Sequence, residues 1–492
     1  MGTWTTTRDA INAIWFQSQD QLVARSRDIV RKDGWASKAV DEWVCNAVGN
    51  GIKPQSLHPV EATKEKIQKL WTQWSSDADA SGTTDIYGVQ ALAFRSMVEG
   101  GECFIRRYAR ATEDGLPVPL QLQVIEAEQL PYYLTRPTTA TPAGHTIKCA
   151  IEFDAMGRRT AYYFFKNHPG ERIFSPTDDE FMRVQASEVM HLFRPLRPGQ
   201  VRGVPWLATA LVRLWELEQY DDAELLRKKF AAMMMAFIVR QNPEDSFFPQ
   251  EQSGEQRAAV ETAGDGIQQA TLEPGTMQEL EPGEDVKFTE PADVGGNYEA
   301  FERLQLLRIA AGIGLPYDML TGDLSQTNYS SIRAGILSFR RLCEQIQYSV
   351  FIHQFCRPVW RAFIEQAVLA GKLDARDYTA HREDYLAVEW HTPKWAWVDP
   401  QKDVKAEIMA IRAGLKSRGM AINEAGMDEE EVDRQIARDN ERADGLGLVL
   451  DSDPRKTTPK GNALGADGAN DGAGEDGQDD GTPQKRKQEE GE

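Results

Sequence analysis

The 492-residue sequence predicts an α+β fold that is mainly helical. Apolar residues recur at three- and four-residue spacing through several long stretches, which is typical of amphipathic helices. Between about residues 84 and 193 this pattern gives way to short runs rich in aromatic and β-branched residues, which is typical of strands. A chain of this length forms more than one core, so several structural regions are expected.

The N-terminal segment, residues 1–55, is predicted to be helical. The segment "GNGIKP" is the expected stop signal of this helical region. The apolar residues at roughly helical spacing are Ile14, Leu22, Ile29, Ala39, Trp43 and Ala47.

Residues 56–203 are predicted to form an α+β region. A helix is expected near "VQALAFRSMVEGG", and "DAMGRR" has the composition of a hairpin turn. The expected strands are "ECFIRRYAR", "LQLQVI", "IKCAIEF", "TAYYFFK" and "EVMHLF".

Two long helices bracketing an acidic insertion are expected next. The first covers residues 204–239 and would be about 50 Å long at 1.5 Å per residue. The insertion covers residues 240–296, and the second helix covers 297–313. From Glu244 to Glu299 the sequence has 14 acidic residues against only Arg257 and Lys287. This part of the chain is therefore expected to be strongly acidic.

The stretch "GIGLPYDMLTGDLSQTNYSSIRAG" interrupts the helical pattern, and residues 314–331 are predicted to be a polar loop without Lys or Arg. Residues 332–398 are expected to contain a long helix, kinked at Pro358, and the strand "YLAVEWHTP", which would return to the earlier sheet. Helices are predicted in 399–451, with Asp399 and Asp428 as N-terminal caps. Residues 452–492 have few apolar side chains and are expected to be disordered.

Composition excludes several functional classes. The formal net charge of −20 argues against a broad basic face that grips nucleic acid. No stretch approaches eighteen apolar residues, so no membrane partner is expected. The five cysteines form no CxxC motif and are interpreted as small buried residues. Phosphate-binding loops, GxSxG and His pairs at metal-binding spacing are absent, so no catalytic residue, metal ligand or cofactor is predicted, and an enzyme is not expected.

Three features leave alternatives open. The carboxylates of Asp178 to Glu180 and of Glu429 to Asp433 could bind magnesium in a nuclease, although solvated surfaces explain them more simply. Arg227, Lys228 and Lys229 point about 100° apart on a helix, so at most two can face one partner. A solvated, intersubunit or phosphate-binding role is possible for them. His191 is interpreted as a core histidine.

Five segments in this order resemble the lambda-type phage portal proteins, over about residues 20 to 440. The segments are "RDIVRKDGWASKAVDEWVCNAVGNGIKP", "VQALAFRSMVEGGECFIRR", "LQVIEAEQL", "HLFRPLRPGQVRGVPWL" and "IAAGIGLPYDMLTGDLSQTNYSSIRAG".

The resemblance implies a portal-type fold and a ring, usually of twelve copies, at one capsid vertex, through which double-stranded DNA enters and leaves. Residues 56–203 would be the α/β wing, the two helices the stem, 240–296 the clip, 314–331 the tunnel loop and 399–451 the helical crown. The implied partners are the terminase large subunit, a head completion or adaptor protein and the major capsid protein. The implied location is the virion, with assembly in the host cytoplasm.

In this interpretation the tunnel loop meets DNA in the channel. A loop that lets DNA slide should lack cations, because each phosphate neutralised by Lys or Arg adds affinity. The expected channel residues are Thr321, Asp323, Leu324, Ser325, Gln326, Thr327, Asn328 and Tyr329. The acidic clip would suit a basic partner, with Glu279, Glu281, Glu284 and Asp285 on that surface. The alternatives are a metal-dependent nuclease of the packaging machinery and another ring protein of the virion neck.

Overall fold

The computed structural model describes residues 8–138, 140–171, 181–232, 236–239, 260–262, 268–270, 277–280, 298–325, 329–393, 400–424, 429–450, 453 and 455. The chain divides into two compact units, Met1–Lys405 and Ala406–Glu492, and each is described by itself. In these residues no helix is long and apolar enough to span a membrane.

The N-terminal region is helical, as predicted. Helices α1 (Ile11–Lys32) and α2 (Gly34–Ala47) pack against each other and against α4 (Ile86–Gly100). The Asp33 side chain accepts a hydrogen bond from the Ala36 amide and so caps α2. The helices end before the predicted stop signal "GNGIKP", and Lys53–Ser56 form strand β1. Helix α3 (Glu61–Ser75) was not predicted.

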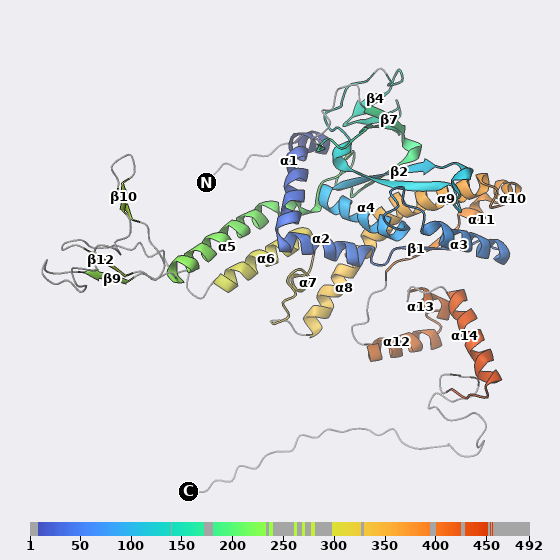
Figure 1. Cartoon of the computed structure of the whole chain (residues 1–492). Coiled ribbons are helices and arrows are strands. Elements are labelled where there is room, and N and C mark those ends of the chain that lie inside the picture. Colours follow the sequence, from blue (N-terminus) through green and yellow to red (C-terminus); the bar gives the residue numbers. More distant parts are fainter. Residues whose placement is uncertain are drawn as a thin grey trace, which may run out of the picture. The chain divides into compact units, whose positions relative to one another are not determined.

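Two antiparallel sheets follow in the chain (Figure 1). The first has the order β3-β2-β8, with β2 at Glu102–Ala109, β3 at Leu120–Glu126 and β8 at Val189–Phe193. The second has the order β4-β5-β6-β7, formed by β4 (Thr146–Lys148), β5 (Ile151–Phe153), β6 (Arg159–Phe165) and β7 (Phe181–Gln185). The predicted α+β character of this region is confirmed.

Two details of the second sheet correct the prediction. The segment "IKCAIEF" is a hairpin and not one strand, because Cys149 and Ala150 adopt φ angles of 49° and 62° and reverse the chain between β4 and β5. Positive φ is uncommon for residues other than glycine, so composition does not signal this turn. Strand β7 was not predicted, whereas the turn at "DAMGRR" is confirmed between β5 and β6.

The strand expected in "YLAVEWHTP" exists as β13 (Val388–His391), but its predicted partner is wrong. It pairs with β1 in a separate two-stranded sheet. The His391 ring shares a 2.8 Å hydrogen bond with Gln55 Oε1 across this pair, so the register is fixed by a buried polar contact as well as by the backbone.

The first long helix is shorter than predicted. After a 3₁₀ turn at Trp206–Thr209, α5 covers Leu211–Ala232, about 33 Å, and Ala236–Val239 form strand β9. The apolar run before residue 240 suits a helix or a strand equally, which explains the error. Strand β9 pairs in parallel with β12 (Met277–Leu280), and β10 (Val260–Thr262) pairs with β11 (Gln268–Ala270). Helix α6 (Tyr298–Ile313) confirms the second predicted helix, and it lies beside α5 (Figure 1).

The long helix after the polar stretch is confirmed with an irregular centre. Helix α8 (Tyr329–Ile346) continues into a π-helical segment, Gln347–Cys356, and then into α9 (Arg357–Leu369). Pro358 lies in the first turn of α9, where its missing N–H leaves one backbone hydrogen bond unmade. Helices often adopt wider π-helical turns where a backbone hydrogen bond is missing. Short helices α10 (Ala375–Ala380) and α11 (Arg382–Leu386) lead to β13.

One large apolar core joins α2, α3, α4 and α9, and its largest side chains include Trp43, Trp74, Phe94 and Trp360. A second apolar cluster lies under the four-stranded sheet. Four of the five cysteines are buried, as predicted, while Cys45 is exposed, and all five are free thiols.

The backbone makes one very close crossing where β2 begins. Gly101 has a φ of 86°, and a Cβ placed there would lie 2.3 Å from the carbonyl carbon of Val204. A Cβ on Gly203 would lie 2.0 Å from the Gly101 oxygen. Only glycine fits both positions. The segment that enters α5 is thereby held directly against the first strand of the sheet.

Helices are also found where 399–451 was predicted to be helical. Helix α12 (Pro400–Arg412) crosses the boundary between the two units, and α14 (Glu429–Gly445) lies in the second unit. Helix α13 (Arg418–Glu424) was not predicted. The expected caps Asp399 and Asp428 lie outside the described residues, as does the tail 452–492 apart from Asp453 and Arg455.

Candidate functional sites on helices α5 and α6, the loop and the sheets

The polar stretch 314–331 is only partly a loop, which corrects the prediction. Tyr317–Thr321 form the short helix α7, whose Leu320 is fully buried. Thr321 therefore ends a helix, and Tyr329 begins α8. Asp323, Leu324 and Ser325 follow α7 as loop residues, whereas Gln326, Thr327 and Asn328 lie outside the described residues.

Asp323 organises the start of this loop. Its Oδ1 accepts hydrogen bonds from the Ser325 amide at 2.9 Å and the Ser325 hydroxyl at 2.6 Å. Its Oδ2 accepts from the Tyr317 hydroxyl at 3.3 Å and lies 3.1 Å from Arg303 Nη1 on α6. The bonds from Ser325 are the main reason that the pKa of Asp323 is lowered, with smaller contributions from Tyr317 and Arg303.

Arg303 belongs to this candidate site and was not predicted from the sequence. Its guanidinium lies 5.0 Å from the centre of the Tyr317 ring while it binds Asp323. Residues 314–331 contain no Lys or Arg, but Arg303 on α6 supplies a positive charge to Asp323 within this stretch. The first loop residues are fixed to α6, and the next side chain, Leu324, is 58% exposed. The start of the loop is therefore polar and anchored to α6, and it presents one exposed apolar side chain.

The three basic residues of α5 have different surroundings. Arg227 binds Glu224 at 2.6 Å, and Lys228 lies 3.8 Å from the same carboxylate. Lys228 Nζ also lies 4.8 Å from the centre of the Tyr298 ring on α6. Lys229 is exposed. Of the three cations, Lys228 therefore contacts α6, whereas the ion pair of Arg227 with Glu224 lies within α5.

Helices α5 and α6 are joined by polar contacts and leave apolar side chains at the surface. The Tyr298 hydroxyl donates to Asp221 at 2.9 Å, and Arg213 donates to Gln305 at 3.1 Å. A groove of about 580 Å³ runs between the helices. The exposed apolar side chains on this pair are Val212, Trp215, Leu225, Leu226, Phe301, Leu304 and Leu307. A helix pair that is apolar on more than one face is typical of a structure that packs against a further partner.

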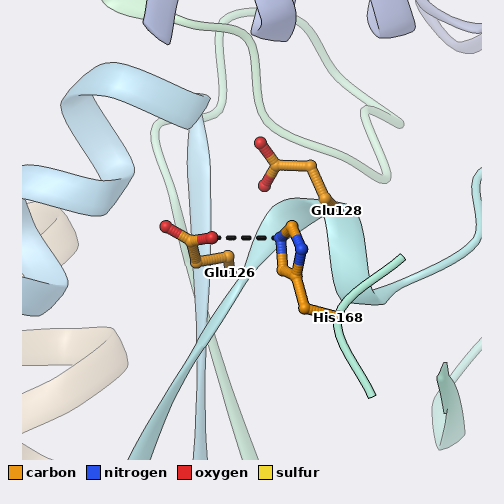
Figure 2. Close-up of side chains that lie close together, drawn as sticks. All are labelled: Glu126, Glu128 and His168. Carbon is orange, nitrogen blue, oxygen red and sulfur yellow. Dashed lines mark ion pairs between the residues drawn. The ribbon is translucent and has the colours of Figure 1, made fainter. Parts of the chain in front are cut away.

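A second candidate site lies where β3 ends. Figure 2 shows the side chains of Glu126, Glu128 and His168, whose ligand-type atoms lie within 4.8 Å of one another. His168 Nε2 is 3.1 Å from Glu126, but Arg27 of α1 binds both carboxylates, at 3.1 Å and 2.5 Å. A guanidinium therefore already neutralises the group that a metal ion would need, and we interpret the cluster as a structural contact between α1 and the sheet.

A third cluster is completely buried. Arg202 binds Glu102 at 2.6 Å, and the His191 ring lies 2.9 Å from the other oxygen of Glu102. Arg202 also donates to the carbonyl oxygens of Cys149, Leu130 and Ala127. Burial alone would raise the pKa of Glu102, but Arg202 and His191 outweigh it and lower the value to about 2. Burial lowers the pKa of His191 to about 4, against the opposing effect of Glu102. His191 is a core residue, as predicted.

The acidic candidates are only partly described. Glu279 belongs to strand β12, while Glu281, Glu284 and Asp285 lie outside the described residues, as does the Asp178 to Glu180 cluster. In the other cluster, Glu429 to Asp433 lie on α14, and Asp433 is ion-paired with Arg418. No described contact among these carboxylates favours the nuclease alternative.

The chain belongs to the family described as "Phage portal protein, lambda family", whose match covers residues 1–347. It is therefore a portal protein, as the order of its motifs suggested. The "Probable portal protein" of Halomonas phage phiHAP-1 is 25% identical over 477 residues, which are 95% of this chain and 88% of that protein. "Portal protein B" of Escherichia phage lambda is 20% identical over 483 residues, 91% of this chain and 88% of that one.

Solved structures give a weaker likeness. A chain of the "Virion of native gene transfer agent (GTA) particle" is 13% identical, with a TM-score of 0.44 over 87% of this chain and 96% of that one. A chain of the "Neck of native GTA particle computed with C12 symmetry" is 14% identical, with a TM-score of 0.44 over 82% and 93%.

Proposed function

We propose that this portal protein acts as a closed ring of twelve subunits at one vertex of a phage capsid, as a conduit for double-stranded DNA during packaging and ejection. Family membership supports the portal role. The observation in the structure that carries the ring is the apolar surface of α5 and α6. Head-to-tail contacts between identical subunits either close into a ring or continue as a filament. We assign this protein no catalytic residue.

In this proposal α5 and α6 are the stem, residues 56–203 the wing, 240–296 the clip and 399–451 the crown. Leu304 and Leu307 are each 47% exposed, and they lie one turn apart on α6. Burial of such side chains against a neighbour contributes about 25 cal/mol per Å² of apolar surface. Stem contacts repeated around the ring would therefore favour assembly.

The tunnel loop is proposed to meet DNA with residues that follow α7 in the chain. Leu324, Ser325, Gln326, Thr327 and Asn328 carry no positive charge, so they can touch DNA without binding its phosphates. Asp323 is reassigned as the anchor of this loop, because it binds Arg303. The acidic clip is proposed to dock the terminase large subunit and later the head completion protein, and the wing to contact the major capsid protein.

Ring formation is tested by mass photometry of the full chain. A twelve-subunit ring of this 55.2 kDa chain has a mass of about 660 kDa. Leu304→Glu combined with Leu307→Glu should abolish that species, because desolvating unpaired carboxylates in the interface opposes association. The matched control is Met156→Glu, an 84% exposed side chain in the β5–β6 turn, which should assemble normally.

Two results would contradict the proposal. One is a wild-type protein that stays monomeric at all concentrations and salt conditions. The other is normal ring formation by the double glutamate variant, which would show that this face of α6 lies outside the interface.

A further inference from the structure

A hollow lined by arginine and tryptophan side chains lies away from the stem and the loop. It has a volume of about 330 Å³ and is formed by α9, α11 and β13. The lining residues are Arg357, Trp360, Arg361, Arg382, Glu383, Leu386, Val388 and Trp390. We call it the arginine groove. Three cations around one hollow are unusual on a chain whose net charge is −20.

Among the residues that the structure describes, two of the three guanidinium groups have no carboxylate partner. Arg357 and Arg361 are exposed on one face of α9, four residues apart, and within the described chain their side chains form no hydrogen bond or ion pair. Burial is the main reason that the pKa of Arg107 on β2 is lowered, and the charge of Arg361 lowers it further. Arg382 is held in position by Glu365 at 3.1 Å and by the Tyr378 hydroxyl at 3.0 Å.

The floor of the groove is aromatic. Trp360 and Trp390 are almost fully buried and meet edge to face, with their ring centres 6.5 Å apart. The indole N–H of Trp360 has no acceptor among the residues that the structure describes. A buried donor without an acceptor is costly, and arginine and tryptophan are the residues most enriched at binding hot spots.

We propose that the arginine groove binds an acidic peptide segment of a partner protein, whose carboxylates bind Arg357, Arg361 and Arg382 while an apolar side chain rests on the partly exposed Leu386 and Val388. A carboxylate matches the guanidinium fork in charge and geometry. This surface lies outside the ring interface proposed above and does not depend on it.

A DNA duplex fits these observations less well than a peptide does. Duplex binding requires many cations spread over a broad face, because affinity comes from neutralising successive phosphates. Here the cations surround a small concavity, Glu383 lies in its wall, and Glu365 already binds Arg382. A short peptide can place one carboxylate at each free guanidinium.

The test is fluorescence anisotropy with the full chain and a labelled synthetic peptide in which Glu alternates with Leu. Wild type should bind with an affinity that falls as salt rises. Arg357→Gln combined with Arg361→Gln should weaken binding about tenfold or more, because charge-assisted hydrogen bonds are lost. Arg361→Lys should give an intermediate affinity. Arg376→Gln, an exposed arginine on α10 outside the groove, is the matched control and should bind as wild type does.

Equal binding by wild type and the double glutamine variant would overturn the proposal, as would binding of the same peptide with Gln in place of Glu. Tighter binding of a labelled DNA duplex, lost in the double variant, would show that the groove serves nucleic acid instead. Mass photometry of the same samples separates this result from assembly, because the groove variants should form rings as wild type does.

Discussion

Arg202 and Arg303 each bind one carboxylate, but the first pair is buried and the second is open to water. Glu102 and Arg202 are at most 1% exposed, whereas Arg303 and Asp323 are each about one-third exposed. Removing one member of a buried pair leaves an uncompensated charge in a medium of low dielectric. An exposed pair contributes little to global stability, because water and salt replace the partner. The buried cluster should therefore hold the fold, and the exposed one should hold only the loop.

Arg202→Met should lower the free energy of unfolding by about 3–5 kcal/mol, because it leaves the buried Glu102 carboxylate without its main partner. Urea denaturation at one protein concentration measures this loss. Glu102→Gln combined with Arg202→Met should recover part of it, since no buried charge then remains. A loss below about 1 kcal/mol for Arg202→Met would show that the Glu102–Arg202 pair contributes no more to stability than an exposed ion pair does.

The buried cluster should also give the fold a defined pH dependence. The pKa of His191 is lowered by burial to about 4 from an ordinary value of 6.5, so the unfolded chain takes up a proton at a higher pH than the folded chain does. Stability should decrease as the pH falls from 6.5 to 4, by about 3 kcal/mol at about 1.4 kcal/mol per pKa unit. Glu102, with a pKa of about 2, should cause a further loss between pH 4.5 and 2.

His191→Gln isolates the histidine contribution, because glutamine keeps a donor near Glu102 and does not titrate. We expect the variant to lose the decrease between pH 6.5 and 4 and to retain the one at lower pH. Thermal unfolding over a pH series measures both. Parallel curves for the variant and wild type would assign the decrease to other groups.

Charges added to the loop should affect DNA movement and leave the fold intact. Ser325→Lys with Gln326→Lys would add about twenty-four positive charges to a twelvefold ring, and packaging should slow because phosphates are then bound. The free energy of unfolding should change by less than about 0.5 kcal/mol, since Ser325 is exposed and both substitutions replace one polar residue with another. Packaging in vitro with and without added salt measures the effect, with Ser325→Gln as the uncharged control. Packaging at the normal rate by the double lysine ring would show that this loop does not meet DNA.

Asp323→Asn should have the smallest effect. Global unfolding should be unchanged, while amide hydrogen exchange in residues 317–325 should become faster, because the bonds from Ser325 and Arg303 weaken. Asp318→Asn on α7 is the matched control. Unchanged exchange in the Asp323 variant would mean that α7 and the loop backbone position this segment without the carboxylate.

The helices were predictable where their apolar spacing was regular over many residues, as in α1, α2 and α8. Prediction failed where the same local composition is compatible with two kinds of secondary structure. The apolar run before residue 240 reads as helix but forms β9, and "IKCAIEF" reads as one strand but contains a turn at Cys149 and Ala150. Short elements such as α7 carry too few periodic positions to be recognised.

The polar loop was visible in the sequence because its composition is local, but its anchor was not. Arg303 precedes Asp323 by 20 residues and belongs to another helix, so only the fold brings the two together. The same applies to the arginine groove, whose cations come from α9 and α11. The sequence spacing between the residues of these two sites follows no recognisable motif. Alternation and periodicity report local structure, and a site assembled from separate elements requires their packing.

The crossing of Gly101 and Gly203 bears on which sequences this fold can tolerate. Their constraint comes from backbone atoms, which cannot move aside as a flexible side chain can. In a saturation mutagenesis library selected for infectious particles, both positions should accept glycine alone, even where alanine is harmless at their neighbours. Such intolerance would ordinarily be attributed to contact with a partner or with DNA. Here it would mark a purely steric requirement, independent of the host, the genome and every protein that binds this chain.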